Sequence, residues 1–103
     1  MIAADTSSLV AYFTGNSGAD VERLAAALTA GELVLPPVVV TEILSDPTGS
    51  PATGEQVERI AQLEPTDGYW VRAGHARRLL HKHGCKAKVG DALIAQSCID
   101  YDV

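Results

Sequence analysis

Short apolar runs alternate with segments of helical period along this chain. Residues 2–4 and 33–35 are continuous apolar stretches of strand length. Within residues 19–30, apolar side chains recur every three or four positions, which predicts an amphipathic helix that stops at Gly31. Strands that alternate with helices in this way indicate a parallel sheet with right-handed crossovers. The pattern therefore predicts an α/β fold.

Capping residues and prolines mark the starts of two more helices. The hydroxyls of Thr6, Ser7 and Ser8 can cap a helix that follows the first strand. The Pro-Pro pair at 36–37 ends the second strand and pre-sets the backbone angle for a new helix. Each predicted strand therefore leads directly into a helix.

The second half of the chain is predicted to be helical. Residues 46–52 are rich in turn formers and predict a surface loop. Thr53, with a glutamine three positions later, makes a capping box for a helix that runs through Leu63. A further helix is predicted between Pro65 and Gly84, followed by a last one near the C-terminus.

Composition fits one globular domain over residues 1–103, with 47% hydrophobic and 20% charged residues. The chain has no apolar run of about 18 residues and no basic segment before its short apolar start, so we expect a cytoplasmic protein. Cys85 and Cys98 are too few for a zinc site or a disulfide framework, and we expect both to be reduced.

The net charge of −5 argues against general nucleic-acid coating, but the charges are unevenly spread. Six of the eight basic residues fall in the acid-free segment 72–88: Arg72, Arg77, Arg78, Lys82, Lys86 and Lys88. This segment is either a cationic patch or a solvated helix face, and the sequence favours neither.

Three acids stand beside apolar runs: Asp5 after the first strand, Glu42 after a run of valines, and Asp91 at the first turn of the last helix. An unpaired buried charge costs on the order of several kcal/mol, so such acids need cations or a shared metal ion. In parallel sheets, ligands bind at the carboxyl ends of the strands. Convergence there would create an all-oxygen site suited to Mg²⁺ or Mn²⁺.

Each acid also has a simpler interpretation. Asp91 could cap its helix, Asp5 could cap a helix or stabilise a turn, and Glu42 could be a solvated residue on an exposed helix edge. Only the combination of the three favours a functional site.

Three short motifs in this order resemble those of the PIN-domain family, in particular the VapC-type toxin ribonucleases. The motifs are Asp5-Thr6-Ser7, Glu42 within Pro36-Pro37-Val38-Val39-Val40-Thr41-Glu42-Ile43-Leu44, and Gly90-Asp91-Ala92-Leu93-Ile94-Ala95.

The resemblance implies a PIN-like three-layer sandwich with a central, mostly parallel sheet flanked by helices. It also implies an endoribonuclease dependent on Mg²⁺ or Mn²⁺, the often dimeric toxin of a toxin–antitoxin pair. Asp5, Glu42 and Asp91 would be its catalytic residues and metal ligands. The metal would activate water for in-line attack, leaving a 5′-phosphate. RNA would be held by Ser7 and by basic residues of the segment 72–88: Arg72, Arg77, Lys82 and Lys86.

Proteins of this kind usually continue past the segment matching 99–103 into another strand and a fourth acid. We therefore expect a C-terminally truncated domain, and neither Asp100 nor Asp102 is assigned as the missing ligand. Two alternatives stay open: a catalytically inactive PIN-like binding module, and a phosphatase-like or receiver-like domain acting on a small phosphorylated substrate. Metal-dependent cleavage of RNA would separate the nuclease from both.

Overall fold

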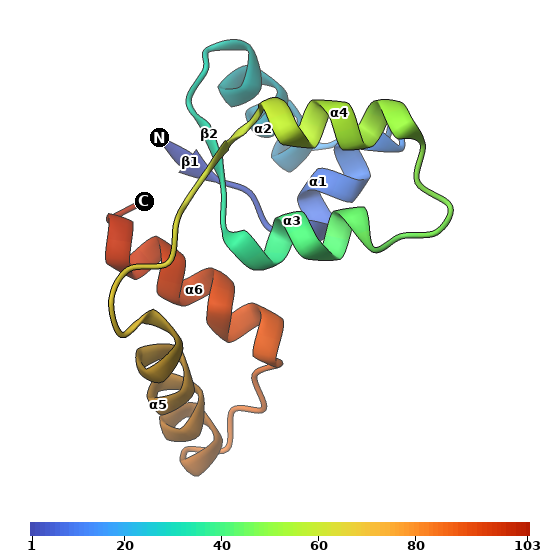
Figure 1. Ribbon diagram of the computed structural model, residues 1–103. Helices are drawn as coiled ribbons and strands as arrows, with labels where there is room; N and C mark the ends of the chain where they lie inside the picture. Colours follow the sequence, from blue (N-terminus) through green and yellow to red (C-terminus); the bar gives the residue numbers. More distant parts are fainter.

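The computed structural model describes residues 1–103, in which three short strands form a parallel sheet and six helices complete the fold (Figure 1). The elements in chain order are β1 Ile2–Ala3, α1 Thr6–Phe13, α2 Ala19–Thr29, β2 Leu33–Leu35, α3 Pro37–Leu44, α4 Pro51–Arg59, β3 Ala61–Gln62, α5 Tyr69–Lys82 and α6 Val89–Tyr101. The predicted α/β fold is confirmed. No helix is both long and apolar enough to cross a membrane.

The strand β2 is the centre of the sheet, whose order is β1-β2-β3. Ile2 of β1 is in register with Leu33, and Val34 is in register with Ala61 of β3. All three residues of β2 are buried because strands flank both its edges and helices cover its faces. A continuous apolar run is what a strand buried on both faces requires.

The strand β3 was not predicted, because the apolar spacing favoured a helix through Leu63. The helix α4 ends at Arg59, and Ile60 already has extended backbone angles. The free edge of β2 explains the difference: the N–H of Leu63 donates to the carbonyl of Leu35 at 2.9 Å. Ile60 and Leu63 still face the core, so the apolar spacing was correct and the helical interpretation was wrong.

Two helix starts also differ from the prediction. Asp5 itself caps α1, in place of the hydroxyls of Thr6, Ser7 or Ser8. The helix α4 begins at Pro51 with Ser50 as its cap, so the loop before it is shorter than predicted and Thr53 lies inside the helix. In both cases the observed cap lies one or a few positions before the predicted one. From there, its side-chain oxygen can accept a hydrogen bond from a free backbone N–H in the first turn of the helix.

The main core lies between the sheet and the first four helices, and α5 and α6 form an antiparallel hairpin beside it (Figure 1). Its buried members are Ala4, Leu9, Leu24, Ala27, Leu33, Leu35, Val39, Ile43, Val57 and Ile60. Helix α6 packs against α3, so the hairpin is joined to the core on the side where α3 lies. Both cysteines are free: Cys85 is exposed and Cys98 is half-buried.

A buried tyrosine joins the two helices of the hairpin. Tyr69 of α5 is 1% exposed, and its hydroxyl donates to the carbonyl of Leu93 at 2.7 Å. The same hydroxyl oxygen accepts a hydrogen bond from Ser97 at 3.2 Å. Because both partners belong to α6, this one side chain fixes how α5 lies on α6.

An ion pair closes the same hairpin at the end where α6 finishes. The guanidinium of Arg72 donates to the carboxylate of Asp100 at 2.6 Å, the only ion pair in the molecule. Asp100 also accepts from Gln96 and Thr66, each at 2.9 Å. The hydrogen bond from Arg72, with those from Gln96 and Thr66, lowers the pKa of Asp100 from 3.8 to about 2.

Removing the hydroxyl of Tyr69 should destabilise the fold. Tyr69→Phe removes the hydroxyl that bonds the part-buried carbonyl of Leu93 and the buried hydroxyl of Ser97, which costs about 1–3 kcal/mol. Tyr12→Phe is the matched control, because the hydroxyl of Tyr12 makes no hydrogen bond within the chain, and its effect should stay within about 0.5 kcal/mol. Urea denaturation of both variants measures the difference; equal midpoints would contradict the assignment.

The contribution of Asp100 to stability should depend on pH with a defined sign. Its pKa is lower in the folded chain, so ionised Asp100 stabilises the fold above the unfolded value and loses this effect as the pH falls towards about 2. The denaturation midpoints of the parent and Asp100→Asn should therefore differ at pH 5 and converge near pH 2. Asp102→Asn, which alters an exposed acid without a hydrogen bond, should show no such convergence. A difference that is unchanged between these pH values would refute this role.

Candidate active site

The three acids singled out from the sequence line one surface pocket. Asp5, Glu42 and Asp91 surround a space of about 340 Å³, together with Thr6, Ser7, Lys88, Gly90 and Ile94. All three carboxylates are exposed to solvent, and none forms an ion pair. They therefore meet in an open cleft and not in the core.

The topology of the sheet explains this convergence. β1 and β2 are parallel neighbours, so the chain leaves both at the same edge, with Asp5 directly after β1 and α3 directly after β2. Glu42 follows on α3, and α6 packs against α3 so that Asp91 in its first turn faces the same pocket. Acids that are 42 − 5 = 37 and 91 − 42 = 49 positions apart thus share one site.

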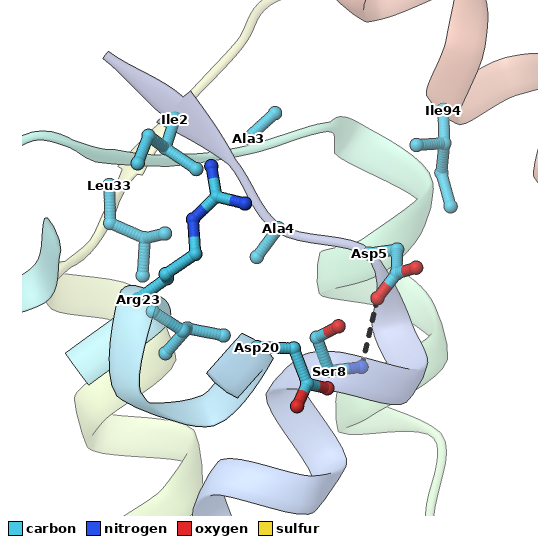
Figure 2. Close-up of a pocket in the computed structure, with 10 residues that line it drawn as sticks. Ile2, Ala3, Ala4, Asp5, Ser8, Asp20, Arg23, Leu33 and Ile94 are labelled. Atoms are coloured by element: carbon cyan, nitrogen blue, oxygen red, sulfur yellow. Dashed lines mark hydrogen bonds between the residues drawn. The ribbon is translucent and has the colours of Figure 1, made fainter. Parts of the chain in front are cut away.

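Asp5 is held by the start of α1. Its Oδ1 accepts a hydrogen bond from the backbone N–H of Ser8 at 2.8 Å (Figure 2). The same oxygen accepts from the hydroxyl of Ser7 at 3.2 Å. The bond from the backbone N–H of Ser8 is the main reason why the pKa of Asp5 is lowered. The interpretation of Asp5 as a cap is thus correct, but the capping residue also lines the pocket, where its negative charge is secure at neutral pH.

Glu42 is held between α1 and α6. Its Oε1 accepts a hydrogen bond from the hydroxyl of Thr6 at 3.1 Å. On the other side lies Gly90, where an added Cβ would stand 3.3 Å from the same oxygen. Glu42 is exposed, as its simpler interpretation predicts, yet its carboxylate has a fixed neighbour on each side.

Asp91 does not cap its helix, so the simpler interpretation of this residue is wrong. The cap position of α6 is Lys88, and no side chain caps the helix. Asp91 is the third residue of α6, and its carboxylate makes no hydrogen bond within the chain. It is the least constrained of the three acids. A carboxylate near a helix N-terminus is still favoured by the helix dipole.

Two residues of the pocket were not singled out for it by the sequence. Thr6, predicted as a cap, instead positions Glu42. Lys88 is the only basic residue that lines the pocket. Its position three residues before Asp91, at the start of the same helix, was the available signal.

The donor set fits a hard divalent cation in its chemistry, and its three acids line one pocket. Carboxylate and hydroxyl oxygens are the ligands that Mg²⁺ and Mn²⁺ prefer, and Asp5, Glu42 and Asp91 provide them on one pocket. No three acidic, histidine or cysteine side chains stand close enough together to hold an ion without moving. Asp91, which makes no hydrogen bond, is the side chain with most freedom to close such a set.

A neighbouring pocket of about 280 Å³ is a weaker candidate. Its lining is mainly apolar and includes Ile2, Leu33 and Ile94 (Figure 2). Of the three acids only Asp5 touches it. It therefore offers no set of converging ligands.

The predicted RNA-binding cations differ in their surroundings. Arg72, 43% exposed, is paired with Asp100, and Nε of half-buried Arg77 donates to the carbonyl of Ala87 at 2.9 Å. Lys82 and Lys86 are exposed and have no polar partner within the chain. RNA contacts by these residues stay predictions, and the two lysines are the cations free to make them.

The parallel sheet and the acidic pocket at its carboxyl edge define an α/β domain with a candidate hydrolytic centre. Residues 2–103 match the PIN domain, so the chain belongs to the PIN domain family, whose members are generally nucleases. The match identifies the family and no subgroup within it. No curated protein and no solved structure matches the chain significantly.

The close approach of Gly90 to Glu42 gives a prediction in which metal binding changes and the stability of the fold serves as the comparison. Gly90→Ala should weaken Mn²⁺ binding about tenfold, because its Cβ presses on the Glu42 carboxylate. Gly74→Ala is the matched control: it is also helical, a Cβ there meets nothing within 4 Å, and it should stabilise α5 by about 0.5–1 kcal/mol without changing Mn²⁺ affinity. Titration calorimetry measures both affinities. Equal Mn²⁺ binding by Gly90→Ala and the parent would argue against a metal held by Glu42.

Proposed function

We propose that this protein is a metal-dependent endoribonuclease, the toxin of a toxin–antitoxin pair, that hydrolyses RNA phosphodiesters. The observation that carries the proposal is the single pocket lined by Asp5, Glu42 and Asp91 in a chain of the PIN domain family. Three acids with one cation, Lys88, create a strongly negative pocket that attracts divalent metal ions. The same pocket repels a bare phosphodiester, so a metal must be present for the reaction.

The proposed ligands are Asp5, Glu42 and Asp91. One or two Mg²⁺ or Mn²⁺ ions held by them would polarise the phosphodiester and lower the pKa of a bound water. The product would carry a 5′-phosphate.

The chain itself contributes orientation. Ser7 and the backbone of Ser8 hold Asp5, while Thr6 holds Glu42, so two of the three carboxylates have fixed directions before any ligand arrives. Preorganised ligands lose less conformational entropy on binding. Asp5 is ionised at neutral pH, as an ordinary aspartate is, and the hydrogen bond from the backbone N–H of Ser8 lowers its pKa further.

The cations are assigned to the phosphate backbone. Lys88 lies in the pocket itself and would contact the phosphate at the cleaved bond. Exposed Lys82 and Lys86 would extend this contact along the strand, where each phosphate bound releases counterions. Arg72 and Arg77 would support the RNA less directly, because their guanidinium groups are already hydrogen-bonded.

The proposed protein partners are an antitoxin segment and a second copy of the chain. Val10, Phe13, Val21, Leu24 and Leu28 are apolar residues of α1 and α2 that such a partner could cover. They are largely used within the fold, since Leu24 is in the core and Phe13 and Leu28 pack against it. Exposed apolar side chains also occur on α5, at Trp70, Val71 and Leu79. Trp70 and Val71 are consecutive, and exposed apolar side chains that lie together mark contact surfaces.

A second candidate function is a binding module of the same family that does not cleave RNA. It is favoured by one observation: no three acids stand close enough together to hold an ion as they are. The cleavage assay below decides between the two functions. If the protein is a binding module without catalysis, the parent chain itself will show no metal-dependent cleavage of RNA.

Replacing Asp91 by Asn tests the proposed chemistry. The amide keeps the shape and removes the charge, so Mg²⁺-dependent RNA cleavage should fall at least about a hundredfold. The fold should be unaffected, because Asp91 caps no helix and makes no hydrogen bond. Asp5→Asn should act in the same way, since Asn caps a helix as well as Asp does.

Asp67→Asn is the matched control, because it removes an exposed carboxylate outside the pocket. Cleavage of a labelled RNA is followed with and without Mg²⁺, and circular dichroism reports the fold. Cleavage by Asp91→Asn at the rate of the parent would rule out the acidic centre.

A further inference from the structure

Besides the acidic pocket and the mainly apolar pocket of Figure 2, the protein has a further pocket, which is called the second pocket below. It lies one helical turn along α1 from the acidic pocket. Thr6 belongs to the acidic pocket and Val10, four residues later on α1, to the second one, a rise of about 5.4–6 Å. Glu42 lines both pockets, and Asp46, just beyond the end of α3, lines only the second. A single group bound in the second pocket would therefore be adjacent to the proposed cleavage site.

The second pocket, of about 270 Å³, is lined by both apolar and polar side chains. Val10, Phe13 and Ile43 provide apolar surface, and Ser50 and Thr53 are among its hydroxyl residues. Apolar side chains together with hydroxyl groups suit a planar ring that carries polar edges.

The charges of this pocket decide what it can accept. Glu42 and Asp46 are the only charged residues in its lining, and no cation is present to bind a phosphate. Oδ1 of Asp46 accepts from the hydroxyl of Thr48 at 2.7 Å and from its N–H at 2.9 Å. These bonds from Thr48 lower the pKa of Asp46, so the residue stays an acceptor. The pocket therefore disfavours phosphate and favours a group with N–H donors, whether neutral or cationic.

We propose that this second pocket binds the nucleobase next to the cleaved phosphodiester and prefers bases that carry an exocyclic amino group. The identity of the ligand as an RNA base rests on the proposed nuclease function. The free oxygen of the Asp46 carboxylate would accept from the amino group of cytosine or adenine, as acidic side chains do when they read cytosine. Uracil presents a carbonyl oxygen at the equivalent edge, which a carboxylate repels.

A titration that needs no catalysis tests the pocket by itself. The isotope-labelled protein is titrated, without metal, with cytidine, adenosine, uridine and arginine amide, and the backbone amide signals are followed by nuclear magnetic resonance. Cytidine and adenosine should shift the signals of Val10 and Thr53 at lower concentration than uridine. Equal shifts with uridine, or shifts with arginine amide alone, would overturn the proposal; the latter would indicate a pocket for a basic peptide side chain.

Cleavage kinetics test the same pocket in the reaction. Two RNA oligonucleotides differ only by cytosine or uracil beside the cleaved bond, and the parent should favour cytosine about tenfold in kcat/KM. Asp46→Asn keeps the acceptor for Thr48 but adds a donor, so the preference should fall to about threefold or less. The matched control Glu55→Gln removes an exposed carboxylate outside both pockets and should keep the preference.

The two experiments distinguish a failure of the proposed base pocket from a failure of the proposed nuclease function. If the parent cleaves RNA but Asp46→Asn keeps the full preference for cytosine, the base pocket is refuted and the nuclease stands. If the parent cleaves no RNA with either metal, the proposed function fails, and the nucleoside titration still decides whether the pocket binds amino-bearing bases.

Discussion

The strand β2 is buried on both faces, and the rest of the structure depends on the hydrogen bonds along its two edges. Buried backbone groups must be paired, so Leu33–Leu35 requires a partner on each side. β1 and β3 provide these partners, both in parallel orientation. Because parallel strands end at a common edge, this pairing also brings Asp5 and the helix that carries Glu42 to one place. The same constraint thus stabilises the sheet and assembles the site.

Much of this arrangement could be predicted because it depends on patterns of neighbouring residues in the sequence. The apolar run at 33–35, the helical period of 19–30 and the acids that follow apolar segments are all visible within a few residues. β3 could not be predicted, since Ala61 and Gln62 are exposed and carry no strand signal. They are extended because a distant strand offers a free edge, and sequence reasoning of this kind does not see such pairing.

The site shows the same division between local and distant causes. That Asp5, Glu42 and Asp91 would share a cleft followed from topology, but which side chains hold them did not. Thr6 reaches Glu42 across 36 positions, and Arg72 is drawn from the basic segment to Asp100 across 28. A basic run in the sequence therefore overstates the number of side chains that are free to bind RNA, because some of them form hydrogen bonds or ion pairs with residues far away in the sequence.

The order of the acids along the chain has a consequence for the protein while it is being made. Synthesis runs from the N-terminus, so Asp5 and Glu42 emerge from the ribosome well before Asp91. The wall of the pocket formed by α6, with Gly90 beside the Glu42 carboxylate, is added only after the first five helices have been translated. A nascent chain thus carries an incomplete set of acids until the residues of α6 have been added.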